Sequence, residues 1–135
     1  MARKPKLKTL KTKLDNIFSQ YIRLKASCRN GYAKCVTCGK IDHWKNHDNG
    51  HFISRAYLPT RFEETNCAVQ CKFCNRYRNG MPDEYAKYIY ETYGKEEYER
   101  LRLLKHSTVK FTQADYEALI ELYKQKVDDL IKNKE

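Results

Sequence analysis

The sequence contains no apolar run of about 18 residues, no apolar stretch behind its basic first residues, and no repeat or low-complexity segment. The first absence argues against a membrane-spanning helix, which needs about 20 consecutive apolar residues. The second argues against a secretory signal peptide, because export requires an apolar h-region. We therefore expect a chain that remains in a reducing cytoplasm, with no membrane partner. No clear linker divides the sequence, so we expect a single domain over residues 1–135.

Acidic residues are few relative to basic ones. The 135 residues include 27 Lys and Arg against 17 Asp and Glu, a formal net charge of +10. The hydrophobic content of 41% and the charged content of 33% are ordinary for a soluble globular protein. Such an excess of positive charge indicates a polyanionic partner, and without a long apolar run nucleic acid is favoured over a membrane. A basic surface that only confers solubility remains the alternative.

Two Cys-x-x-Cys pairs carry the strongest chemical signal: Cys35 with Cys38, and Cys71 with Cys74. Four thiolates at about 2.3 Å complete the tetrahedral shell of a structural zinc site. Gly39 suits the tight turn after the first pair, because a residue without Cβ can adopt positive φ. A disulfide framework would need a secreted context, and a thioredoxin-like redox pair would not explain two matching pairs. We interpret the two pairs as one four-cysteine zinc site. The two other cysteines, Cys28 and Cys67, are expected to be reduced, small buried residues.

The 32 residues between Cys38 and Cys71 exceed the usual zinc-ribbon spacing of about 15–20, so we expect a structured insert. Residues 48–55 read as a short strand that carries His51. Asn66 lies before the second cysteine pair and Asn75 directly follows Cys74. If Cys74 starts a helix, the amide oxygen of Asn75 can bind a hard cation such as Mg²⁺. An ordinary hydrogen-bonded histidine remains the alternative for His51.

These motifs, in this order, resemble HNH endonucleases of the treble-clef, ββα-metal kind. They resemble most closely the lambdoid phage NinG (Rap) recombination nucleases and, at the site, phage endonuclease VII, which resolves Holliday junctions. The likeness covers roughly residues 15–105. It rests on these phrases: Gly31-Tyr32, Cys35-x-Thr37-Cys38, Gly50-His51-Phe52-Ile53-Ser54-Arg55, Arg61-Phe62-Glu63-Glu64, Glu64-x-Asn66, Cys71-x-x-Cys74-Asn75 and Tyr93-Gly94.

The resemblance implies that His51 is the general base, that Asn66 orients it and that Asn75 is a ligand of a catalytic Mg²⁺ or Mn²⁺. The chemistry is consistent with these roles. Phosphodiester hydrolysis needs a water deprotonated near neutral pH, which suits an imidazole with an ordinary pKa of about 6.5. A cation on the scissile phosphate would stabilise the leaving oxygen. If the gene belongs to a phage, the protein would act in the cytoplasm of the bacterial host.

One position departs from the HNH pattern. Many members have an acidic residue or a histidine directly before the base as a second metal ligand, and here that residue is Gly50. Asp48, two residues earlier and therefore on the same face of a strand, is the first substitute. Water could fill the shell instead, and Asp48 could simply cap the turn at Asp48-Asn49-Gly50. Weaker candidates for this ligand are Asp42, His43 and His47.

Four arginines near the predicted site are candidates for binding DNA phosphates: Arg55, Arg61, Arg76 and Arg78. The guanidinium fork binds phosphate through two hydrogen bonds, which makes arginine well suited to this contact. A surface salt bridge is the alternative for each of them.

Helical segments are expected on both sides of this core. Apolar residues at helical spacing predict a basic N-terminal helix over about 8–26 within residues 1–27, preceded by a basic arm. In residues 81–135, Pro82 begins a helix that Gly94 ends, a second helix covers about 95–105, and Thr112 with Asp115 begins a long last helix. The apolar stripe of the last helix could pack on the N-terminal helix or on a second copy of the chain. The 11 tyrosines are interpreted as core residues rather than base-stacking residues.

The predicted fold class is α+β and mostly helical, with a zinc-bound ββα-metal core at residues 28–80 between N-terminal and C-terminal helices. The predicted function is a metal-dependent endonuclease acting on DNA, with branched or Holliday-junction DNA as substrate and a homodimer as one possible assembly. The alternative is a zinc-bound DNA-binding module without catalysis, which the glycine at position 50 favours.

Overall fold

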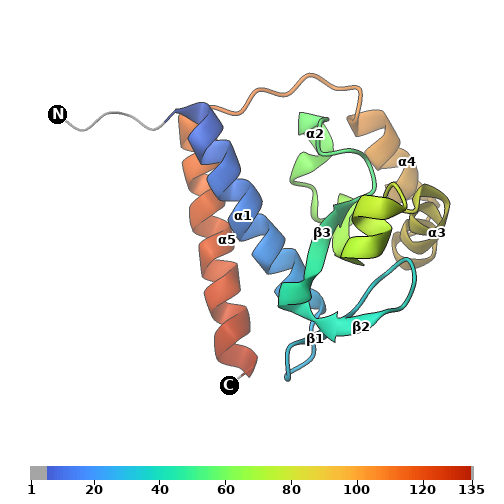
Figure 1. Cartoon of the computed structure of the whole chain (residues 1–135). Helices are drawn as coiled ribbons and strands as arrows, with labels where there is room; N and C mark the ends of the chain where they lie inside the picture. The colour runs from blue at the N-terminus through green and yellow to red at the C-terminus, as the bar shows by residue number, and fades with distance from the viewer. Residues whose placement is uncertain (1–5, 135) are drawn as a thin grey trace.

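The computed structural model describes residues 6–134, and Figure 1 shows how its elements are arranged. The α-helices are α1 (Leu7–Ala26), α2 (Leu58–Arg61), α3 (Pro82–Tyr93), α4 (Lys95–Leu104) and α5 (Gln113–Lys134). The strands are β1 (Tyr32–Lys34), β2 (Ile41–His43), β3 (His47–His51) and β4 (Cys67–Cys71). Two short 3-10 turns, η1 (Trp44–Asn46) and η2 (Glu64–Asn66), and a π-helical turn, η3 (Phe73–Tyr77), complete the structure. The chain is therefore mostly helical with a small β component, as the sequence predicts.

The four strands form two separate antiparallel hairpins. In the first, β1 pairs with β2, with Tyr32 opposite His43. In the second, β3 pairs with β4 along five residues, from His47 opposite Cys71 to His51 opposite Cys67. The chain turns directly from β4 into η3, so strand, strand and helical turn follow one another around the predicted site.

The two long helices lie side by side along one edge of the molecule (Figure 1). Their facing stripes form the larger apolar core, in which Leu14 and Phe18 of α1 are almost fully buried. From α5 this core receives Tyr116, Ile120, Tyr123 and Val127. The packing of α5 on α1 confirms one of the two predictions for the apolar stripe of the last helix, because the stripe is buried within the chain.

A second apolar cluster joins the β3–β4 hairpin to α3 and α4. Ala68 of β4 packs there with Tyr85, Ile89 and Leu101, and the hydroxyl of Tyr85 donates a 2.7 Å hydrogen bond to the carbonyl of Gly50. The hairpin is thus held between the long helices on one side and the short helices on the other.

The helix boundaries agree with the signals in the sequence. Pro82 occupies the first turn of α3, and Gly94, with φ of 91°, ends it. At the start of α5 the backbone N–H of Thr112 donates to the Asp115 carboxylate over 2.8 Å, and the backbone N–H of Asp115 donates to the Thr112 hydroxyl over 3.2 Å. This is the reciprocal arrangement of a capping box. The five N-terminal residues of the predicted basic arm lie outside the described part of the chain.

Two sequence predictions are wrong in detail. The strand expected over residues 48–55 ends at His51. The side chain of Asn66 hydrogen-bonds to both the N–H and the carbonyl of Ile53, so these groups do not bond to a neighbouring strand. Cys28, expected to be buried, is exposed in the turn between α1 and β1, whereas Cys67 is buried as expected.

No helix within residues 6–134 has the length and apolarity needed to cross a lipid bilayer.

Candidate functional site

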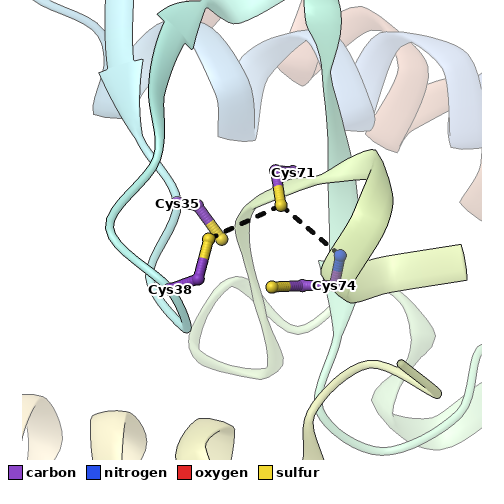
Figure 2. A group of neighbouring side chains, drawn as sticks. All are labelled: Cys35, Cys38, Cys71 and Cys74. Carbon is purple, nitrogen blue, oxygen red and sulfur yellow. Dashed lines mark hydrogen bonds between the residues drawn. The ribbon is translucent and has the colours of Figure 1, made fainter. Parts of the chain in front are cut away.

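The four predicted zinc ligands come together between the two hairpins (Figure 2). Cys35 and Cys38 belong to the turn that joins β1 to β2, Cys71 ends β4, and Cys74 lies in η3. The four sulfur atoms lie within 4.8 Å of one another, and the sulfurs of Cys38 and Cys71 are 3.6 Å apart. Two segments separated by more than thirty residues therefore present one compact group of sulfurs.

The chemistry of this cluster fits a closed structural metal site. Cys35, Cys71 and Cys74 are buried and Cys38 is exposed. Burial acts to raise the pKa of the Cys35 thiol, but hydrogen bonds from Thr37 and from backbone N–H groups outweigh it, so the pKa lies below its ordinary value. Gly39 has the predicted positive φ of 83° in the turn. Four converging cysteine sulfurs could hold a metal such as zinc, which prefers tetrahedral sulfur coordination.

An open cleft of about 530 Å³ lies between α1 and the β3–η3 part of the molecule. Six of the residues predicted for the site line it: Asp48, His51, Arg55, Arg61, Asn75 and Arg76. Asn66 and Arg78 are not among the described residues that line this cleft. The structure therefore brings the proposed base, the proposed cation ligands and three of the four proposed phosphate-binding arginines to one surface.

His51 ends β3 at the wall of this cleft. Its Nε2 lies 2.9 Å from the carbonyl oxygen of Arg61. Because a carbonyl oxygen can only accept a hydrogen bond, Nε2 carries the proton and Nδ1 keeps its lone pair. Burial lowers the pKa of His51 below 6.5, and the charges of Arg55 and Arg61 lower it further against the opposing effects of Asp15 and the Arg61 carbonyl. The imidazole is therefore neutral near pH 7 and can accept a proton at Nδ1.

Asp48, Asn75 and Arg76 form a hydrogen-bonded group beside it. The Asn75 side-chain N–H donates to one carboxylate oxygen of Asp48 over 2.9 Å. Arg76 donates to both carboxylate oxygens, over 2.9 and 3.0 Å. Burial raises the pKa of Asp48, but these donors more than compensate, so its pKa lies below the ordinary value and the group is a carboxylate near pH 7.

Asn66 is fully buried and touches the backbone rather than the ring of His51. Its Oδ1 accepts the N–H of Ile53 over 2.8 Å, and its Nδ2 donates to the carbonyls of Ile53 and Thr60, over 3.1 and 3.0 Å. Thr60 directly precedes Arg61, whose carbonyl holds His51. Asn66 therefore fixes the end of the short helix α2, whose last residue supplies the acceptor for the histidine.

The arginines differ in their availability. Arg61 is 8% exposed and its guanidinium forms an ion pair with Asp15 of α1, including a 2.9 Å bond from Nε. Arg55 reaches the same carboxylate over 3.1 Å but its side chain is 63% exposed. Arg78 lies over the ring of Phe73, with its guanidinium 5.0 Å from the ring centroid. The structure thus shows the salt-bridge alternative for Arg55, Arg61 and Arg76. Of these, Arg61 is buried, whereas Arg55 and Arg76 are exposed, as is Arg78.

Helix α1 contributes a wall of the cleft that the sequence motifs do not assign to the site. Lys8, Lys11 and Asp15 line the cleft from this helix, with Thr12, Asn16 and Ser19. One signal is present in the sequence: Asp15 is the only acidic residue before Asp42, in the midst of a basic segment. Its partners at positions 55 and 61 cannot be identified without knowing how α1 packs.

The structure also explains Gly50. A Cβ atom added at this position would lie 2.0 Å from Oε1 of Gln70, whose side chain is fully buried. A ligand side chain at position 50 is therefore excluded by packing. The weaker candidate ligands lie elsewhere: Asp42 bonds to the backbone N–H of His43 and to Asn46, while His47 bonds to the carbonyl of Ala33. Of all the candidates, Asp48 is the one that lines the cleft beside Asn75.

Comparisons with known proteins identify the family of this chain. The profile of a family described as "NinG: Bacteriophage Lambda NinG protein" matches residues 1–135. The chain is 29% identical over 99 residues to the proteins named "Protein ninG" of Escherichia phage 933W, Escherichia phage lambda and Salmonella phage P22. The matched region covers 71% of this chain and 47% of each relative, so the chain spans about half the length of the curated relatives it matches. No solved structure matches significantly. Because the family profile matches along the whole sequence, this chain belongs to the NinG family.

Proposed function

We propose that this protein is a metal-dependent endonuclease that hydrolyses phosphodiester bonds in DNA, with branched DNA such as Holliday junctions as its substrate in phage recombination. The observation that carries the proposal is the cleft in which a neutral His51 lies beside Asp48, Asn75 and exposed arginines. The order of elements supports it as well, because β3, β4 and the π-helical turn η3 would correspond to the strand, strand and helix of a ββα-metal site. In that comparison the zinc-bound cysteines would join the first hairpin to this core, as in a treble clef.

His51 would act as the general base. Its Nδ1 would remove a proton from water as the water oxygen attacks the phosphorus, while the carbonyl of Arg61 stabilises the imidazolium that forms by accepting from Nε2. The bond from phosphorus to the leaving oxygen would then break. Asn66 would serve as a positioning residue, because it bonds to the end of α2, where Arg61 lies.

The group formed by Asp48 and Asn75 fits a hard cation. The carboxylate and the amide carbonyl are oxygen donors of the kind that Mg²⁺ and Mn²⁺ prefer. The two side chains are in contact through the Asn75 N–H, so cation binding would require the Asn75 amide to turn its oxygen toward the ion. When bound, the cation would polarise the scissile phosphate and stabilise the charge of the leaving oxygen. Binding would require Arg76 to release Asp48, after which its guanidinium could bind a phosphate oxygen. Zinc would have a separate, structural role at the four cysteines.

The test is cleavage of labelled four-way junction, Y-shaped and linear duplex DNA with Mg²⁺ or Mn²⁺. Loss of the base is expected to reduce the rate by about 10²–10⁴-fold in His51→Ala. His106→Ala is the matched control, because His106 is exposed and lies after α4, away from the cleft. The proposal fails if the zinc-loaded wild type cuts none of these substrates with either cation, or if both variants cut at the wild-type rate.

The alternative is a DNA-binding module without catalysis, and the ion pair between Asp48 and Arg76 favours it. Arg76 occupies both carboxylate oxygens that a cation would need. Under this alternative, wild type and His51→Ala bind DNA equally and neither cuts. The same substrate series therefore separates the two functions. A homodimer remains a prediction, and Tyr116, Ile120, Tyr123 and Val127 of the α5 stripe are buried against α1, so this part of the stripe is not available to a second copy.

A further inference from the structure

The turn η3 carries two aromatic side chains that the proposed chemistry does not use. Tyr77 is 78% exposed, the highest value among the large apolar and aromatic side chains of residues 6–134, and Phe73 is 55% exposed. Neither belongs to the buried clusters of the protein. In contrast, Tyr21, Tyr85, Tyr116 and Tyr123 are buried, as expected for core tyrosines. Contact between apolar surface and water is unfavourable, so a pair of exposed aromatic rings indicates a surface that binds another molecule.

The π-helical geometry of η3 arranges these rings as one surface. The N–H of Arg78 donates to the carbonyl of Phe73 over 3.1 Å, a bond that spans five residues and widens the turn. The ring centroids of Phe73 and Tyr77 are 6.2 Å apart with an interplanar angle of 31°, and the Arg78 guanidinium lies 5.0 Å from the centre of the Phe73 ring. We call Phe73, Tyr77 and Arg78 the aromatic surface.

The position of the aromatic surface links it to the cleft. Asn75 and Arg76, which lie between the two rings in the sequence, line the cleft that contains His51. A strand whose phosphate lies at His51 would therefore have its neighbouring nucleotides within reach of η3. Lys72, Arg76 and Arg78 are exposed on the same short segment.

We propose that the aromatic surface stacks unpaired DNA bases next to the scissile phosphate. This rests on the proposed function only in taking DNA as the partner. Charge selects this occupant, because the exposed Lys72 and Arg78 beside the rings and the net charge of +10 favour a polyanion and would repel a second copy of this basic chain. Stacking selects unpaired bases, because bases inside a duplex already stack on their neighbours, whereas bases at a branch point can turn a face to an aromatic ring.

The test is binding of fluorescent single-stranded, Y-shaped and blunt duplex DNA to the zinc-loaded protein without added Mg²⁺ or Mn²⁺. Stacking of a base on an aromatic side chain accounts for about a 5- to 150-fold change in affinity per base, and we expect the lower end at so exposed a residue. Tyr77→Ala is therefore expected to weaken single-stranded and Y-shaped DNA binding by about fivefold or more, with less than about a twofold change for duplex. Phe73→Ala is expected to act in the same direction, and Tyr77→Phe, which keeps the ring, to bind as the wild type does.

Tyr90→Ala is the matched control, because Tyr90 is an exposed tyrosine on α3 that does not line the cleft. Equal losses for single-stranded and duplex DNA in Tyr77→Ala would overturn the proposal, since they indicate a phosphate contact. Wild-type affinity in Tyr77→Ala, an equal loss in Tyr77→Phe, or conversion of a dimer to a monomer without an effect on DNA binding would also overturn it. Because binding is measured without cleavage, a protein that stacks bases but cuts nothing would retain this inference while the nuclease proposal fails.

Discussion

The hydrogen bond between His51 and the Arg61 carbonyl determines what the histidine can do. It assigns the proton to Nε2 and leaves the lone pair on Nδ1, in a side chain that lines the cleft. The neighbouring charges have opposite effects on this ring: Arg55 and Arg61 disfavour the imidazolium, and Asp15 favours it. The pKa of His51 therefore depends on Asp15 of α1 as well as on Arg55 and on Arg61 of α2.

This balance leads to a prediction about pH. The lowered pKa of His51 keeps the neutral base present below pH 6.5, so cleavage should decline only at more acidic pH, as the imidazole becomes protonated. In Arg55→Gln a neighbouring cation is lost, so the pKa of His51 should rise. An NMR titration of the imidazole in the free protein, assigned with His51→Ala, measures this directly. An unchanged or lower pKa in Arg55→Gln would contradict the electrostatic account.

The contact between Gly50 and Gln70 gives a second prediction. Gly50→Ala places a methyl group 2.0 Å from Oε1 of Gln70, so the glutamine side chain must move and lose its bonds to Thr37 and to the carbonyl of Gly80. We expect a loss of about 1–3 kcal/mol in the free energy of unfolding, measured by urea denaturation. In a Gln70→Ala background the same glycine substitution should cost much less. Additive effects in this double-mutant cycle would show that the clash is not the cause.

At the scale of elements, helices were predictable because their signals are local. Apolar spacing, Pro82, Gly94 and the pair of Thr112 with Asp115 all act within a few residues, and α1, α3, α4 and α5 begin and end close to the predicted positions. The end of β3 was not predictable, because Asn66 determines it from thirteen residues away through its bonds to Ile53. For the same reason the cysteines and His51 could be chosen from motifs, whereas the contribution of α1 to the cleft required knowledge of packing.

Glu64 connects three elements and supplies a prediction at this scale. From η2 its carboxylate accepts bonds from Tyr21 of α1, over 3.0 Å, and from Tyr123 and Lys126 of α5, over 3.1 and 3.2 Å. Burial acts to raise the pKa of Glu64, but these donors outweigh it and the pKa lies below its ordinary value. Folding therefore stabilises the carboxylate relative to the protonated form. The resulting stabilisation is present above the unfolded pKa of about 4.3 and is lost as pH falls through the lower folded value.

We therefore expect Glu64→Gln to reduce the free energy of unfolding by about 1–2 kcal/mol at pH 7, with a smaller difference from the wild type at acidic pH. Denaturant titrations at several pH values measure this. Glu63→Gln is the matched control, because Glu63 forms a more exposed pair with Arg100, which should contribute less than about 1 kcal/mol. A difference for Glu64→Gln that is independent of pH would point to a packing effect rather than to the charge.

At the scale of the whole molecule, the cysteine cluster adds a cross-link between the β1–β2 hairpin and the β3–β4 hairpin, which are otherwise joined by a few hydrogen bonds, such as those from His47 to Ala33 and from Gln70 to Thr37. Strands β1 and β2 have three residues each, and an isolated two-stranded hairpin is at best marginally stable in water. The cluster connects this hairpin to Cys71 and Cys74, at the junction of β4 and η3 (Figure 2). Asn75 follows the last of these cysteines, so the position of a proposed cation ligand depends directly on the cluster.

Removal of zinc should therefore abolish the site while leaving part of the helical structure. After chelation and removal of zinc we expect a large fall in melting temperature and a loss of DNA cleavage that Mg²⁺ alone does not restore, whereas Zn²⁺ together with Mg²⁺ does. Because α1 and α5 have their own apolar core, far-UV circular dichroism should retain a helical signal.

Cys71→Ser should behave like the chelated protein. Cys28→Ser changes an exposed cysteine outside the cluster and should therefore keep both zinc and stability. A zinc-free protein with an unchanged melting temperature and full Mg²⁺-dependent cleavage would contradict this account. The four sulfurs would then converge without a structural metal, and the packing of β3 and β4 between the two groups of helices would be sufficient to hold the site.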